Sequence, residues 1–214
     1  MRAEEVRAAG VTYQISEEAR EAESKTLDIC LDMYNAGCPE IFFKSTPSRT
    51  VGPNDAIGIC SDSDRNVPEP ELAVVPYDGN IVGYTVGNDV SSRSIGGENP
   101  LYLPQAKVYD RCCSIGPSIA SPSAIEDLRD LSLAMSISRD GETVYDERTS
   151  TGEMVHTCEE LVSYYTRHNT VPGVSVLLAG TSLVPEEGFT LRAGDPMDIS
   201  IKEIGMLSSD LTEV

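Results

Sequence analysis

Two apolar runs on either side of a short turn constrain the fold of this chain most strongly. The stretch NVPEPELAVVPYDGNIVGYTVGNDVSSRS covers residues 66–94, with runs at 70–77 and 81–88 around an Asp-Gly pair. Asp-Gly between apolar runs is typical of a β-hairpin. Similar short runs recur along the chain, whereas only 16–36 and 151–167 show helical spacing. The sequence therefore predicts a β-rich α+β fold in a single domain.

Three acidic residues stand at the open end of this hairpin. Glu69 and Glu71 begin the first run, and Asp89 ends the second. Because side chains alternate along a strand, Glu69 and Glu71 point the same way, with Cα atoms about 7 Å apart. Converging carboxylates suit a hard cation such as Mg²⁺, Mn²⁺ or Ca²⁺. A solvated sheet edge fits the same spacing, so the residues alone leave both interpretations open.

The register of the hairpin decides whether Asp89 can join the pair. With a two-residue loop at 78–79, paired residue numbers sum to 157, and Glu69 faces Asn88. With a three-residue loop, or a bulge of the same effect, the sum is 158 and Asp89 lies opposite Glu69. A metal site requires the second arrangement. We therefore expect even sums next to the acidic residues.

Two lysines attract attention because the chain has only four. Lys107 follows an irregular segment rich in Gly and Pro and lies in the apolar stretch PLYLPQAKVYD, where an unpaired ammonium would be costly. Beside a bound dication its pKa would be lowered, towards use as an acid or base; the alternative is a side chain that reaches solvent. Glu40 and Lys44 share one face of the predicted strand EIFFKS, where a surface ion pair is the simple interpretation.

The charge of the chain excludes some partners. Acidic residues outnumber basic ones by 35 to 16, a net charge of −19, and they are dispersed along the chain. Nucleic acid and anionic membranes both require clustered positive charge, so neither is expected as a partner. Dispersed acid with little lysine is typical of proteins from a high-salt cytoplasm. No apolar run is long enough for a membrane span and no secretory signal is evident, so we expect a soluble, cytoplasmic protein.

The cysteines do not indicate a metal site. No CxxC pair and no Cys/His cluster with zinc spacing occurs in the sequence. We therefore expect buried free thiols in a reducing compartment. The six cysteines are Cys30, Cys38, Cys60, Cys112, Cys113 and Cys158.

Seven stretches in order along the chain together resemble the fumarylacetoacetate hydrolase family. They are AGVTY (9–13), PEIFFK (39–44), PEPELAVV (68–75), GYTVGNDVSSR (83–93), PLYLPQAKVYD (100–110), LLAGTSLVP (177–185) and RAGDPMDISIKEIGML (192–207). The resemblance implies a mixed β-sandwich roll. It also implies a Mg²⁺ site, with Mn²⁺ or Ca²⁺ as alternatives, at Glu69, Glu71 and Asp89. Lys107 would be the lysine of the site, and Thr181 would bind substrate.

Within this family, the chain is most similar to 2-keto-3-deoxy-pentonate dehydratases of the type found in halophilic archaea. That similarity implies a Mg²⁺-dependent hydro-lyase of pentose catabolism that forms 2,5-dioxopentanoate from a small 2-keto acid. Glu40 and Lys107 would transfer the protons. The family's hydrolases carry a histidine shortly after the AGVTY-like motif, near Ser16 here. The chain's two histidines lie elsewhere, at 156 and 168, which disfavours the hydrolase reaction.

Other members of the family remain as alternatives. The first alternative is another enzyme of the family: an acylpyruvate hydrolase, an oxaloacetate decarboxylase or an isomerase. Another is a truncated, non-catalytic member, because relatives carry a further segment before AGVTY and because Ser94 replaces an Asp that many relatives have. We expect residues 1–214 to form one catalytic domain, with 1–10 as a short lead-in, and to assemble as a homodimer or homotetramer.

Overall fold

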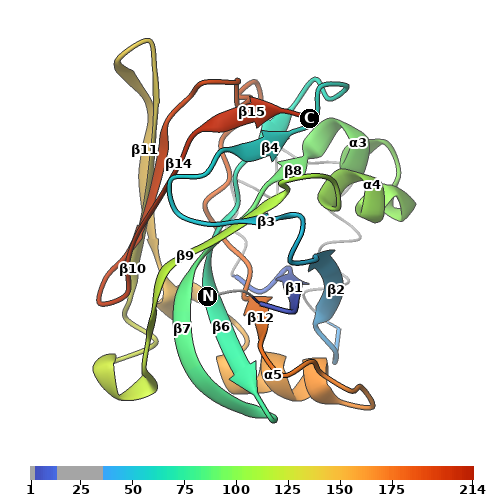
Figure 1. The fold of residues 1–214 in the computed structure, drawn as a ribbon, viewed down its shortest axis with the longest axis vertical. Coiled ribbons are helices and arrows are strands. Elements are labelled where there is room, and N and C mark those ends of the chain that lie inside the picture. The colour runs from blue at the N-terminus through green and yellow to red at the C-terminus, as the bar shows by residue number, and fades with distance from the viewer. Residues whose placement is uncertain (1–2, 14–35) are drawn as a thin grey trace.

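A seven-stranded sheet forms the centre of the protein in the computed structural model, which describes residues 3–13 and 36–214 (Figure 1). The strand order is β2-β1-β12-β6-β7-β9-β3, and parallel and antiparallel neighbours both occur. The strands are β1 (Glu5–Gly10), β2 (Glu40–Ser45), β3 (Thr50–Val51), β6 (Pro70–Tyr77), β7 (Asn80–Asp89), β9 (Cys113–Ala120) and β12 (Ser175–Leu178).

A four-stranded antiparallel sheet, in the order β11-β10-β13-β14, stands beside the first one. Its edge is visible on the left of Figure 1. Its strands are β10 (Ser132–Arg139), β11 (Glu142–Ser150), β13 (Met197–Ile201) and β14 (Gly205–Ser209). Two short ladders complete the described strands: β4 (Ile57–Ile59) with β15 (Leu211–Glu213), and β5 (Asn66–Val67) with β8 (Ser91–Ser92). The predicted β-rich α+β class is confirmed.

Strand β6 explains how the two sheets share a core. Leu72 and Val74 pack into the larger cluster, between the sheets, together with Leu133 of β10. Ala73 points to the opposite face and packs with Val176 of β12 in a second cluster. Because β6 is buried on both faces, its sequence is a nearly continuous apolar run rather than an alternating one.

The helices are short and lie at the edges of the sheets. They are α3 (Arg93–Glu98), η1 (Pro100–Tyr102), α4 (Leu103–Lys107), η2 (Pro122–Ala124), η3 (Thr151–Glu153) and α5 (Cys158–Thr166). The expectation of an irregular segment before Lys107 was wrong, since α3, η1 and α4 occupy it. Across the described part of the chain, none of the helices has the length and apolar character needed to cross a bilayer.

The helix predicted at 151–167 begins later than expected. Residues Thr151–Glu153 form a separate 3-10 turn, and α5 starts after Thr157. Thr157 and Glu160 cap each other's backbone N–H groups, a capping box that fixes this start. The other predicted helix, at 16–36, falls almost entirely outside the described residues.

The hairpin of β6 and β7 has the register that a metal site requires. Tyr77 pairs with Asn80 around a two-residue turn, in which Asp78 and Gly79 both have positive φ. A bulge then shifts the register between Val75 and Pro76. Beyond the bulge the sums are even, as in the pair Glu71↔Gly87. The predicted even register is confirmed, and the bulge rather than the loop produces it.

Candidate metal and catalytic site

The three hairpin carboxylates converge as the register predicts. Glu69, Glu71 and Asp89 each place one carboxylate oxygen within 4.8 Å of the others. Glu71 is 2% exposed and Asp89 is 1% exposed, so the cluster lies inside the protein. A solvated sheet edge, the alternative interpretation, is therefore wrong.

Main-chain contacts hold Asp89 opposite Glu69. The Asp89 N–H donates to the Glu69 carbonyl oxygen at 2.9 Å. In return, the Glu69 N–H donates to the side-chain Oδ1 of Asn88 at 3.1 Å. These two bonds close the open end of the hairpin, so the side chains of Glu69 and Asp89 start from neighbouring backbone positions.

Lys107, the last residue of α4, reaches into this acidic cluster. Its Nζ donates to Glu69 Oε2 at 2.5 Å and to Asp89 Oδ2 at 2.9 Å. Burial alone would lower the pKa of Lys107, but the charges of Asp89 and Glu69 outweigh it and raise the pKa. The interpretation of Lys107 as a solvent-facing lysine was wrong, and without a dication its pKa moves up rather than down.

Glu71 differs from its two neighbours because it forms no ion pair with a lysine or arginine of the described residues. Its Oε2 accepts a hydrogen bond from the Gly180 N–H at 2.5 Å, and no ion pair to Glu71 occurs among the described residues. Burial first, and then the charges of Asp89 and Glu69, raise its pKa well above the usual value. An unpaired buried carboxylate of this kind needs a cation or a proton.

The loop after β12 supplies the partner of Glu71. Gly180 has φ +85°, and a side chain there would overlap the Thr12 hydroxyl, which donates to the Ala179 carbonyl oxygen at 2.5 Å. Only glycine fits both the conformation and the space. Thr181 follows directly, half-buried, and its Oγ1 accepts from the Leu183 N–H at 3.0 Å. Thr181 thus lies one residue from the contact to Glu71.

Glu40 lies at the start of β2, paired with Gly10 of β1. A Cβ atom on residue 10 would overlap the Glu40 carboxylate, so Gly10 provides the space that this side chain occupies. Burial raises the pKa of Glu40, Lys107 lowers it, and Asp89 and Glu69 raise it further. The net pKa is raised, and Glu40 lies within the electrostatic reach of the cluster.

Lys44 is a residue of the site that the sequence interpretation missed. It forms no surface pair with Glu40; its side chain is fully buried and its Nζ lies 2.6 Å from Asp89 Oδ1. Together, Lys107 and Lys44 outweigh the burial of Asp89 and lower its pKa. The scarcity of lysine was the available signal, because two of the four lysines meet at one carboxylate.

Residues near the cluster from α3 play smaller parts. Arg93 Nη2 lies 3.7 Å from Glu69 Oε1, and Ser92 caps the helix. The Ser94 hydroxyl forms a hydrogen bond with the Ser63 hydroxyl at 2.8 Å. It makes no described contact with the acidic residues.

The histidines and cysteines take no part in the cluster. His156 lies 3.7 Å from Glu160 at the start of α5, and His168 follows the end of that helix. Of the described cysteines, Cys38 is exposed and the remaining four are buried, all with free thiols. The described thiols are free as expected, and the expectation that they are buried was wrong for Cys38.

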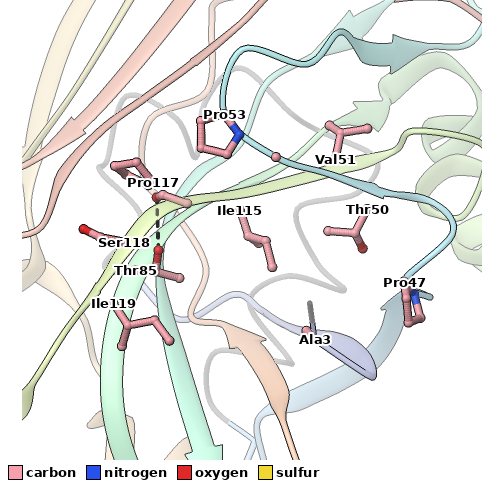
Figure 2. A pocket seen from close by; sticks show the side chains of 12 residues that line it. Ala3, Pro47, Thr50, Val51, Pro53, Thr85, Ile115, Pro117, Ser118 and Ile119 are labelled. Atoms are coloured by element: carbon pink, nitrogen blue, oxygen red, sulfur yellow. Dashed lines mark hydrogen bonds between the residues drawn. The ribbon is translucent and has the colours of Figure 1, made fainter. Parts of the chain in front are cut away.

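A hollow of about 360 Å³ lies elsewhere on the protein (Figure 2). Pro47, Thr50, Pro53, Ile115 and Ile119 are among the side chains around it, and none of the described residues that line it is ionisable. The chemistry of the molecule is therefore concentrated at the acidic cluster rather than at this hollow.

The comparisons with known proteins agree with this geometry. Residues 7–212 match the family described as "Fumarylacetoacetate (FAA) hydrolase C-terminal". A "Probable 2-keto-3-deoxyxylonate dehydratase" of Haloferax volcanii is 64% identical over 212 residues, which are 99% of this chain and 73% of that protein. A "2-dehydro-3-deoxy-D-arabinonate dehydratase" of Saccharolobus solfataricus is 40% identical, over 95% of this chain and 70% of that protein.

A solved structure extends the similarity to three dimensions. It is a 2-keto-3-deoxy-D-arabinonate dehydratase complexed with magnesium and 2,5-dioxopentanoate. The TM-score is 0.92 at 38% sequence identity, and the match covers 100% of this chain and 74% of that one. The agreement covers both the sheets and the elements that carry the acidic cluster.

Proposed function

The chain belongs to the fumarylacetoacetate hydrolase family, and from this premise we propose that it dehydrates a 2-keto-3-deoxy-pentonate to 2,5-dioxopentanoate with Mg²⁺. The observation that carries the proposal is the buried cluster of Glu69, Glu71, Asp89 and Lys107 in a chain 64% identical to a dehydratase of this kind. The physiological role would be pentose catabolism.

The residues of the cluster fit a magnesium ion. Three carboxylate oxygens are hard ligands at suitable separation. Glu71 is buried with no ion-pair partner among the described residues, so a bound cation would supply the charge that it lacks. Glu69, Glu71 and Asp89 would hold the ion. When bound, Mg²⁺ would polarise the 2-keto group of the substrate and so make its C3 protons more acidic.

The remaining site residues suit the proton transfers of a dehydration. The reaction removes a proton from C3 and a hydroxyl from C4, which leaves as water; proton shifts then convert the C5 alcohol to an aldehyde. Glu40, with its raised pKa, and Lys107, with its three N–H groups, would exchange these protons. Lys107 and Thr181 would also bind the substrate, whose carboxylate is complementary to the ammonium group.

A hydrolase or decarboxylase of the same family is the second candidate function. Members of the family that hydrolyse acylpyruvates use a histidine after the AGVTY-like motif, and this chain has Ser16 near that position. Its two histidines lie at either end of α5, where they make no described contact with the carboxylates. The absence of such a base favours dehydration over hydrolysis.

A substrate panel tests the proposal. The purified protein, in high salt with saturating Mg²⁺, receives 2-keto-3-deoxyarabinonate, 2-keto-3-deoxyxylonate, an acylpyruvate and oxaloacetate in separate reactions. We expect 2,5-dioxopentanoate from one or both pentonates and little turnover of the others. Turnover of the acylpyruvate or oxaloacetate without dehydration would replace the proposal with the second candidate, and no turnover at all would indicate a non-catalytic member.

Domain organisation, location and assembly are the second part of the proposal. We propose that residues 1–214 act as one catalytic domain that works in the cytoplasm as a homodimer or homotetramer. The shared apolar core of the two sheets supports a single domain. Light scattering after gel filtration in high salt would determine the assembly, and a monomeric mass would contradict it.

A further inference from the structure

We propose that Lys44 is a positioning residue, which orients Asp89 towards the cation and fixes the main chain of Lys107. Three oxygen atoms lie within 3 Å of its Nζ: Asp89 Oδ1 at 2.6 Å, the Val90 carbonyl at 2.9 Å and the Lys107 carbonyl at 2.5 Å. The inference rests on the proposed metal site and adds a residue that neither the sequence pattern nor the comparisons assign.

The burial of Lys44 restricts its ammonium group to one position. The side chain is fully buried, and its ammonium donates hydrogen bonds to the Val90 and Lys107 carbonyl oxygens and forms an ion pair with Asp89 Oδ1. The ring of Tyr109 lies 5.6 Å from Nζ, an additional favourable contact. Because moving the ammonium would leave a buried charge without partners, we expect Lys44 to stay where it is.

The contacts of Lys44 join three distant parts of the chain. Lys44 itself is on β2, Asp89 and Val90 are at the end of β7, and Lys107 ends α4. Since β2 also carries Glu40, Lys44 connects the strand of the proposed proton-transfer residue with one metal ligand and with the site lysine.

The consequence for Asp89 is a fixed division between its two oxygens. Oδ1 faces Lys44, and Oδ2 faces Lys107 and the side of Glu69. Oδ1 lies in the ion pair with Lys44 and accepts no hydrogen bond from a described residue, whereas Oδ2 accepts one from Lys107, so Lys44 would hold the carboxylate in one orientation towards the cation. Partners that orient a metal ligand typically contribute 10- to 100-fold to metal affinity.

The consequence for Lys107 concerns its backbone. Helix α4 has only five residues, so little within the helix itself holds its last carbonyl group. The charge-assisted bond from Lys44 to that carbonyl fixes the point from which the Lys107 side chain extends. Without it, the Lys107 ammonium would lose its exact placement between Glu69 and Asp89.

The test compares Lys44→Met with Arg139→Met as a matched control. Arg139, like Lys44, makes three close contacts to oxygen, two to Asp195 and one to the Thr190 carbonyl, but outside the acidic cluster. Both variants should melt at a lower temperature. In titrations with Mn²⁺ followed by electron paramagnetic resonance, we expect Kd to rise about 10- to 100-fold in Lys44→Met and to stay unchanged in Arg139→Met.

The possible outcomes separate the inference from the proposed function on which it rests. A folded Lys44→Met protein with the Mn²⁺ affinity of the wild type would overturn the inference, and so would an equal loss of affinity in Arg139→Met. If Lys44→Met does not fold, Lys44→Arg keeps the charge in a different geometry: weaker Mn²⁺ binding supports the inference, and unchanged binding overturns it. No Mn²⁺ binding by the wild-type protein would overturn the proposed function itself.

Discussion

Two groups of charges in this protein differ in how their charges are compensated. Arg139 and Asp195 form a balanced pair, with Nε–Oδ1 at 3.0 Å and Nη2–Oδ2 at 2.6 Å, and the Arg192 N–H also donates to Asp195. The acidic cluster at the end of the hairpin is unbalanced at Glu71, which has a backbone N–H but no ion pair among the described residues. A balanced pair serves the stability of the fold, whereas the unbalanced cluster leaves a charge for a ligand to compensate.

Replacing Glu71 should give the largest effect. Glu71→Gln removes a proposed metal ligand and a buried carboxylate without an ion pair among the described residues, so we expect loss of Mg²⁺ binding and a fall in kcat/KM of at least about 10³-fold, equivalent to several kcal/mol. The unfolding free energy without metal should be unchanged or higher. Calorimetric Mg²⁺ titration, steady-state kinetics and urea denaturation measure the three quantities. Full activity in this variant would remove Glu71 from the metal site.

The balanced pair should respond in the opposite way. Asp195→Asn leaves the Arg139 guanidinium without its carboxylate, and we expect a loss of about 2–3 kcal/mol in unfolding free energy, below the range for a fully buried pair since Arg139 is partly exposed. Mg²⁺ affinity and kcat should stay within about twofold of the wild type. A strong loss of Mg²⁺ affinity in the folded variant would show that the Arg139–Asp195 pair is not independent of the acidic cluster.

A glycine that makes room for Glu40 gives a third, smaller effect. In Gly10→Ala the new Cβ would displace the Glu40 carboxylate. A displacement of about 1 Å is enough to lower kcat up to about 100-fold, while the Kd for Mg²⁺ should not change because Glu40 is not a ligand. Rapid kinetics measure kcat, and a parallel metal titration measures the Kd for Mg²⁺. Equal losses in metal affinity and kcat would show that Glu40 is coupled to the cation site.

The smallest effect concerns the pH dependence of stability. The pKa of Glu40 is raised in the folded protein, so the folded state favours its protonated form. The stability of the wild type relative to Glu40→Gln is therefore highest below the unfolded-state pKa of about 4.3. It should fall as pH rises through the raised pKa and then become constant. Urea denaturation of both proteins from pH 4 to pH 8 measures the difference, and a rise with pH would contradict the raised pKa.

The sequence predicted the architecture of the site better than its chemistry. Alternation along an extended backbone places Glu69, which directly precedes β6, and Glu71 on the same side. The even register was predicted because a metal site requires Asp89 to lie opposite Glu69. The length of the hairpin loop could not be predicted from the sequence. A two-residue loop with a bulge at Pro76 and a three-residue loop give the same pairing of residues near the acidic cluster. The backbone conformation in the structure is needed to distinguish the bulge from the longer loop.

Lys44 and the helix predicted at 151–167 show two different limits of the sequence interpretation. Strand periodicity puts Glu40 and Lys44 on one face, but the burial of Lys44 depends on β7 and α4, which are distant in sequence. The start of the helix could be read from nearby residues, because Thr157 and Glu160 have the spacing of a capping box. This capping signal is a better guide to the first residue of the helix than the apolar pattern that suggested Thr151.

The most direct test of the central claim is the rate of 2,5-dioxopentanoate formation as Mg²⁺ is titrated into metal-free protein with a 2-keto-3-deoxy-pentonate. The account predicts no product in excess chelator, a saturable rise with Mg²⁺, and no rise in Glu71→Gln. Product formation at the same rate in chelator, or its absence at saturating Mg²⁺ with both the arabinonate- and xylonate-derived substrates, would contradict it.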